Sequence, residues 1–144
     1  MKLTASSIMR SKLVMCDSTS KLKEVTKKML DEKVGSVLIK QNEDIAGIIV
    51  DKDILRAVLD DKDFASTTAA EIMSSPLDCC NADDSLEKCK ELFEKTKRSR
   101  LVVREGEKVV GTLLSKFVGR FLNISKRFSL AEISPTPRFR TGRG

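Results

Sequence analysis

The sequence contains no histidine, and this absence excludes several kinds of chemistry. Histidine is the usual general base for serine and cysteine nucleophiles, so catalysis of those two types is excluded. Zinc also loses its imidazole ligands, and the four cysteines have no Cys-x-x-Cys spacing to replace them. The sequence therefore predicts no catalytic residue and no metal site. The cysteines are interpreted as reduced thiols that pack as small apolar side chains: Cys16, Cys79, Cys80 and Cys89.

Long apolar runs are also missing, since none approaches the ~20 residues that a membrane-spanning helix needs. The N-terminus lacks the apolar core of a signal peptide. These two absences predict a cytoplasmic protein. Apolar residues still make up 40% of the chain and charged residues 33%, which is typical of a globular protein. A chain of 144 residues is long enough for one domain, or for two small ones that share a core.

Positive charge is concentrated at the C-terminus of a chain whose net charge is +6. Residues 125–144 contain five lysines and arginines but a single acidic residue, Glu132. Proline and glycine in the same stretch argue against a regular element, so we expect a basic, flexible tail. An alternative is that its arginines, interleaved with Phe128 and Phe139, bind nucleic acid or an acidic partner.

The chain matches itself without a gap when it is shifted by 64 residues, as the pairing of Gly47 with Gly111 illustrates. Apolar positions are shared along with the identities, which indicates an internal duplication. The predicted repeats are residues 4–60 and 68–124. Further identities pair Ile8-Met9 with Ile72-Met73, Cys16 with Cys80, Lys52 with Lys116, and Arg56 with Arg120.

Each repeat predicts the same order of elements, β-α-β-β-α, which is an α+β fold. A pair of such repeats is expected to pack about a pseudo-twofold axis and to share one core, because one copy alone would be marginal. Gly35 is predicted to stop the first long helix. The first repeat is predicted to contain a strand at 13–16, a helix at 22–33, strands at 37–40 and 45–50, and a helix at 51–59. The second is predicted to contain a helix from residue 86, strands at 100–103 and 109–114, and a closing helix after Ser115.

This duplicated unit resembles the cystathionine-beta-synthase (CBS) domain pair, or Bateman module, over residues 4–124. The resemblance rests on Ile8-Met9 and Ile72-Met73, on the helix starts Asp-Ser-Thr-Ser-Lys-Leu and Asp-Asp-Ser-Leu, and on the strands that reach Gly47 and Gly111. It implies a regulatory module that binds an adenosyl ligand such as AMP, ATP or S-adenosylmethionine in clefts between the repeats. It also implies a homodimer with a disc-like shape and a separate effector protein that reads the ligand-bound state.

The resemblance points to the segment in which a strand passes directly into the helix at 51–59. The family motif is glycine, two apolar residues, threonine or serine, two variable residues and aspartate. Gly47 and Asp53 match this motif, whereas Val50 replaces the hydroxyl residue. The resemblance therefore implies that Asp53 holds the ribose hydroxyls, beside backbone N–H groups that favour an anion. The structural alternative is that Asp51 caps the helix and Asp53 offsets its dipole.

The second repeat departs further from the motif, because Leu114 replaces the hydroxyl residue and Phe117 replaces the acid. Phenylalanine cannot accept a hydrogen bond from ribose, so at most one typical site per chain is expected. The resemblance also implies that main-chain groups hold the base and that nearby cations meet phosphates, although solvated side chains are the alternative for the cations. The base-contacting residues would be Met15, Cys16, Gly35, Ser36 and Val37, and the cations would be Lys52 and Arg56.

Three functions of different class remain open at this level. The first is the small-molecule sensor, and the second is a ligand-free dimerisation or adaptor module, which the altered motifs at Val50, Leu114 and Phe117 favour. The third is a nucleic-acid-associated protein that uses the basic tail. Enzymatic activity is not expected, since the sequence shows no nucleophile–base pair.

Overall fold

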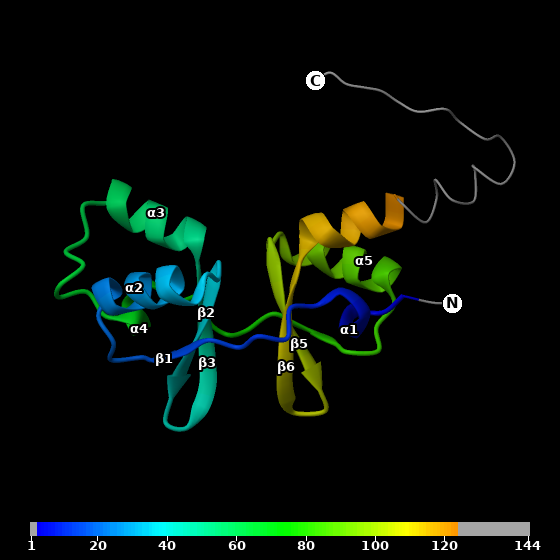
Figure 1. Cartoon of the computed structure of the whole chain (residues 1–144), viewed down its shortest axis with the longest axis horizontal. Helices are drawn as coiled ribbons and strands as arrows, with labels where there is room; N and C mark the ends of the chain where they lie inside the picture. Colours follow the sequence, from blue (N-terminus) through cyan, green and yellow to red (C-terminus); the bar gives the residue numbers. More distant parts are fainter. Residues whose placement is uncertain (1–2, 124–144) are drawn as a thin grey trace, which may run out of the picture.

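The computed structural model describes residues 3–123, so the predicted basic tail at 125–144 lies outside the described residues. The elements form two similar halves that lie side by side (Figure 1). The first half contains β1 (Met15–Asp17), α2 (Leu22–Glu32), β2 (Ser36–Gln41), β3 (Asp44–Val50) and α3 (Asp51–Leu59). The second half contains β4 (Cys79–Asn81), α5 (Leu86–Thr96), β5 (Arg100–Glu105), β6 (Lys108–Leu114) and a helix over residues 115–123. Two short helices, α1 (Ala5–Ile8) and α4 (Ala69–Ile72), precede the two halves in sequence.

Each half is built on a three-stranded mixed sheet, with the orders β1-β2-β3 and β4-β5-β6. The first pair of strands in each sheet is parallel and the second pair is antiparallel. Met15 lies opposite Leu38 and Cys79 opposite Val102, so the register also repeats at an offset of 64 residues. Even the irregularity after Ile39 recurs after Val103. The predicted α+β fold with two β-α-β-β-α repeats is therefore confirmed.

The first long helix ends earlier than the glycine rule predicts. Helix α2 ends at Glu32, and Lys33 adopts a left-handed conformation with φ of 58° at its C-cap. Its counterpart Lys97 does the same after α5. Lysine adopts this conformation at a steric cost that glycine would not carry. The prediction that Gly35 stops the helix is wrong, and this glycine has a different role described below.

The start of α3 also differs from the structural alternative considered above. The N-cap position is Val50, and Asp51 is already the first helical residue. The carboxylate of Asp53 reaches back instead, and its Oδ2 accepts a hydrogen bond of 2.9 Å from the backbone N–H of Val50. Both carboxylates therefore satisfy a backbone donor at this helix start, because Asp51 Oδ1 accepts a hydrogen bond of 2.9 Å from the N–H of Lys52.

Two hydrophobic cores form, so the prediction of one shared core is wrong, and each core takes one short helix from the other sequence repeat. Ala69, in α4, is fully buried in the core that contains Leu22, Val25 and Ile49. Ala5, in α1, is fully buried in the core of the second half. Figure 1 shows the N-terminal segment crossing from the second half, where α1 lies, to β1 in the first. The predicted boundaries 4–60 and 68–124 describe the repeat in sequence and stay a prediction as domain boundaries. They do not match the two cores, because α1 packs in the second core and α4 in the first.

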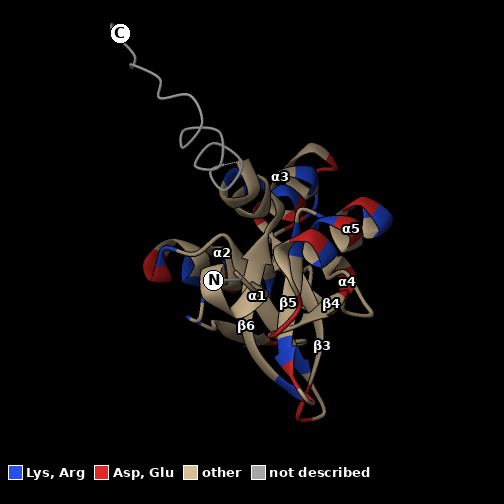
Figure 2. Ribbon diagram, turned by 90° about the vertical axis from the view of Figure 1, so that its right-hand side faces the viewer, with Lys and Arg blue, Asp and Glu red and all other residues tan. Residues whose placement is uncertain are grey.

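Backbone hydrogen bonds hold the exchanged segments symmetrically. The N–H of Ala5 donates to Asp84 O at 2.9 Å, and the N–H of Ala69 donates to Ser20 O at 2.7 Å. These pairs are again related by the 64-residue offset. Acidic and basic residues are interspersed along α5 (Figure 2). Within residues 3–123, no helix is both long and apolar enough to cross a membrane.

Candidate functional site

The predicted site lies where β3 ends and α3 begins at once. Ser36 pairs with Val50 across the antiparallel strands, and the N–H of Asp51 donates to Gly35 O at 3.0 Å. Val37, the next residue of β2, pairs with Ile49 and is fully buried. The structure therefore brings the start of β2 against the start of α3.

The Asp53 carboxylate has one oxygen engaged by the protein and one that is not. Its Oδ2 accepts the Val50 N–H, and within the described residues its Oδ1 has no hydrogen-bond partner. The side chain is partly buried, so that bond fixes its position. A cap role and a ligand role are compatible here, because a carboxylate accepts at both oxygens.

The two predicted cations, Lys52 and Arg56, are exposed on α3. Neither forms an ion pair within the part of the chain that the structure describes. They remain available to an anion beside Asp53, and no ion pair within residues 3–123 fixes their position.

Met15 and Cys16 do not join this site. They lie on the edge strand β1, separated from β3 by β2. With Lys28 and Lys40 they line a different cavity of about 260 Å³, which Asp53 does not reach. The Met15 carbonyl already accepts a bond of 2.8 Å from Lys28 Nζ, and burial raises the pKa of the Cys16 thiol.

Arg100 is a residue of this region that the sequence reasoning missed. A Cβ atom on Gly35 would collide with its Nη2 atom and would lie 3.4 Å from Asp51 Oδ2. Gly35 therefore makes room for a guanidinium from the other half of the molecule. Burial lowers the pKa of Arg100, Asp51 opposes this shift, and nearby Arg10 adds to it. Arg100 is the counterpart of Ser36, a predicted site residue, in the second repeat. The alignment of the two copies could therefore have singled out Arg100 as a candidate site residue.

The segment before β4 runs beside the same strand. Ile48 and Ser74 exchange backbone hydrogen bonds of 3.1 and 2.9 Å. Arg98 then joins the segment to the second half, through Nε to Asp78 Oδ2 at 2.8 Å and through Nη1 to Ser74 Oγ at 3.2 Å. These polar groups were also missed, because only the folded chain places them next to β3.

The equivalent region of the second repeat has a different character. Phe117, which replaces the acid, is partly buried. Three cations approach its ring, with Arg10 Cζ at 5.5 Å, Lys116 Nζ at 5.8 Å and Arg120 Cζ at 5.5 Å from the centroid. We call these four residues the Phe117 cation cluster.

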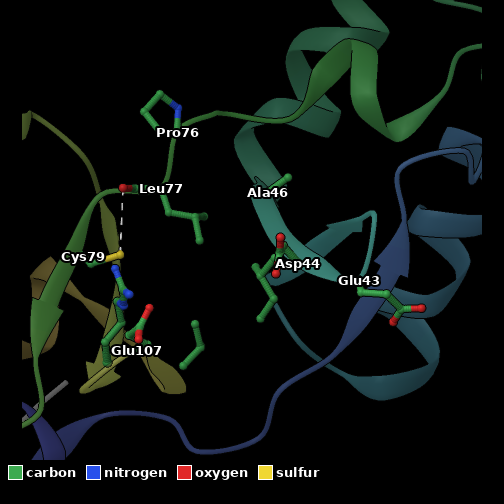
Figure 3. A pocket seen from close by; sticks show the side chains of 10 residues that line it. Glu43, Asp44, Ala46, Pro76, Leu77, Cys79 and Glu107 are labelled. Carbon is green, nitrogen blue, oxygen red and sulfur yellow. Dashed lines mark hydrogen bonds between the residues drawn. The ribbon is translucent and has the colours of Figure 1, made fainter.

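A separate cavity of about 540 Å³ lies at the hairpin ends of the two sheets (Figure 3). Its walls come from both β-hairpins and from the segment before β4, and include Asp44, Leu77, Cys79 and Glu107. Asp44 begins β3 and Val50 ends it, so this cavity and the Asp53 region are at opposite ends of the strand. None of the predicted site residues lines it.

Comparison with known proteins identifies the fold. An uncharacterized conserved protein from Pyrococcus horikoshii has a TM-score of 0.74 at 20% identity, over 99% of this chain and 98% of that chain. A CBS domain protein from Pyrobaculum aerophilum, complexed with AMP, has a TM-score of 0.73 at 20% identity, over 86% and 99%. The CBS domain pair of protein MJ0100, in complex with 5-methylthioadenosine and S-adenosyl-L-methionine, has a TM-score of 0.74 at 20% identity, over 87% and 99%. No curated protein sequence matches the chain.

The sequence model of the CBS domain matches the chain twice, over residues 5–60 and 69–116. These two matches fall on the two repeats and together cover more than half of the chain. The family predicted from the duplicated motifs is therefore confirmed. The chain belongs to the CBS domain family.

Proposed function

We propose that the protein is a regulatory module that binds an adenosyl ligand, AMP, ATP or S-adenosylmethionine, beside Asp53. The observation that carries this proposal is the Asp53 carboxylate, held at the α3 start by Val50 and left with Oδ1 unpartnered within residues 3–123. Similar folds in complex with AMP and with S-adenosyl-L-methionine support it. The signal would pass to a separate effector protein, and no catalytic step is part of the proposal.

The proposed ligand contacts follow from the placement of the side chains. Asp53 Oδ1 would accept from a ribose hydroxyl, while Lys52 and Arg56 would meet the phosphate or carboxylate end. The main chain of Gly35 and Ser36, with Arg100 from the second half, would border the ligand. The proposed site does not include Met15 and Cys16, because β2 separates their strand from β3, which leads into Asp53.

Titration calorimetry with AMP, ATP and S-adenosylmethionine tests the site. Asp53→Asn keeps an acceptor for the Val50 N–H but removes the charge, so binding should weaken about tenfold or more. Asp60→Asn, which removes an exposed carboxylate at the far end of α3, is the matched control and should bind as the wild type does. Equal affinity of the Asp53 variant and the wild type would remove Asp53 from the site.

A ligand-free dimerisation or adaptor module is the second candidate, and a specific surface favours it. Leu55, Val58 and Leu59 on α3 are 65%, 58% and 83% exposed. Their spacing places them on one face of the helix, where a second copy of the chain would cover them. Failure of every adenosyl compound to bind, together with a stable dimer, would favour this candidate. The nucleic-acid alternative depends on residues 125–144, outside the described residues, and stays a prediction.

A further inference from the structure

Folding gathers positive charge around Phe117 from distant parts of the sequence. Arg10 comes from the N-terminal segment, whereas Lys116 and Arg120 come from the helix over 115–123. Arg10 is brought there by a pair of backbone bonds with Thr112, 2.8 and 2.9 Å long. All three cationic groups lie within 6 Å of the centre of one ring. Like charges repel one another, and the negative face of the Phe117 ring carries no net charge, so it offsets this repulsion only in part.

Nothing in the described part of the chain supplies a net negative charge to offset the rest. Arg10, Lys116 and Arg120 form no ion pair there, and their side chains are exposed to an incoming ligand. The field of Arg10 also reaches Arg100, whose pKa it lowers in addition to the larger effect of burial.

The matching region of the first repeat shows how unusual this arrangement is. Lys116 and Arg120 correspond to Lys52 and Arg56, but Phe117 corresponds to Asp53 and Arg10 to Ser74. One region thus has two cations and a carboxylate, and the other has three cations and an aromatic ring. The ring offers no acceptor for a ribose hydroxyl, whereas the two guanidinium groups suit phosphate oxygens.

We propose that the Phe117 cation cluster binds a chain of phosphate groups and recognises it without a nucleoside. A phosphate chain is compact and carries several negative charges, so it would neutralise Arg10, Lys116 and Arg120 together. Inorganic polyphosphate and the phosphate tail of a nucleotide share this chemistry. This site is additional to the adenosyl site proposed at Asp53 and does not depend on it.

Titration calorimetry of the full chain with inorganic tripolyphosphate, ATP and AMP in about 20 mM salt tests the proposal. Tripolyphosphate should bind, and affinity should fall as salt screens the charges. Arg10→Gln and Lys116→Gln should each weaken tripolyphosphate binding about tenfold. Lys95→Gln removes an exposed lysine from the last turn of α5 and is the charge-matched control, with an expected change below twofold. Melting temperatures close to that of the wild type would show that the exposed substitutions leave the fold intact.

The same titrations separate the two possible sources of the phosphates and the two sites. ATP that displaces tripolyphosphate with equal affinity supports recognition of the phosphates alone. Displacement of tripolyphosphate by AMP would place the anion at the adenosyl site and overturn the proposal. Loss of tripolyphosphate binding in the Asp53→Asn variant would do the same. Absence of tripolyphosphate binding would also overturn it, as would a much tighter interaction with a single-stranded oligonucleotide. The adenosyl proposal is tested separately, by comparing the binding of AMP and S-adenosylmethionine to the wild type and to the Asp53→Asn variant.

Discussion

Two glycines of the second repeat differ in how closely they are packed, so we expect the same substitution to change stability in opposite directions. A Cβ on Gly111 would lie 2.6 Å from both Arg10 O and Met9 Sδ, and Arg10 O is held by its bond from Thr112. A Cβ on Gly119 would meet nothing within 4 Å. We expect Gly111→Ala to lower the free energy of unfolding by ~1–3 kcal/mol, because the core segment must shift. Gly119→Ala, in the helix over 115–123, should raise it by ~0.5–1 kcal/mol.

Urea unfolding of the two variants and the wild type measures both changes on one scale. The paired design removes any general effect of adding a methyl group. Similar values for the two substitutions would contradict the close approach of the N-terminal segment to β6.

At the level of single residues, the sequence identifies positions that require glycine but not the contacts that require it. The motif singles out Gly47 and Gly111, and the structure supplies the physical reason, which is a segment from the other sequence repeat packed against each. Local rules predict that Gly35 ends a helix. Its actual neighbour, Arg100, lies 65 positions away in sequence, so no local pattern could reveal that contact. The same holds for Arg98 and Ser74, which only the tertiary fold brings beside β3.

The individual elements follow their periodic patterns closely. Helix α3 has the predicted bounds, and β2 and β3 extend the predicted strands by one residue at one or both ends. The missed elements are α1 and α4, which contain four residues each. One turn of helix is too short to show a 3.6-residue period, so its signal is absent from the sequence.

Helix α3 carries the most direct prediction at this scale, since its outer face is apolar. Association through Leu55, Val58 and Leu59 should make the wild type a dimer in sedimentation experiments. Leu59→Glu should then yield monomers, because burying a leucine contributes ~1.5–3 kcal/mol and a buried unpaired carboxylate opposes association further. Lys23→Glu, on the exposed face of α2, introduces the same side chain elsewhere and should leave the dimer intact. A wild type that stays monomeric at high concentration would exclude this surface as the dimer interface.

For the whole molecule, the exchange of α1 and α4 means that neither sequence repeat contains its own complete core. The first core needs Ala69, Ile72 and Met73, which follow the first repeat in sequence. It does not use α1, whose residues belong to the second core. The sequence reveals the duplication but not this exchange. Both copies have the same apolar pattern, so either short helix could complete either core.

Two fragments of equal length test which segments make a folding unit. Residues 1–66 contain the first repeat with α1, whereas residues 11–76 replace α1 with α4. Both are near the size at which a single core is marginal, so a few buried side chains decide the outcome. We expect residues 11–76 to be the more stable by roughly 2–4 kcal/mol, since they retain the apolar side chains of α4 and the 2.7 Å bond from Ala69 to Ser20. Circular dichroism and the dispersion of amide proton resonances would distinguish a folded 11–76 from a largely unfolded 1–66. A fragment 1–66 as well structured as 11–76 would show that the first core closes without α4, and that the exchanged helices are attached to cores already complete.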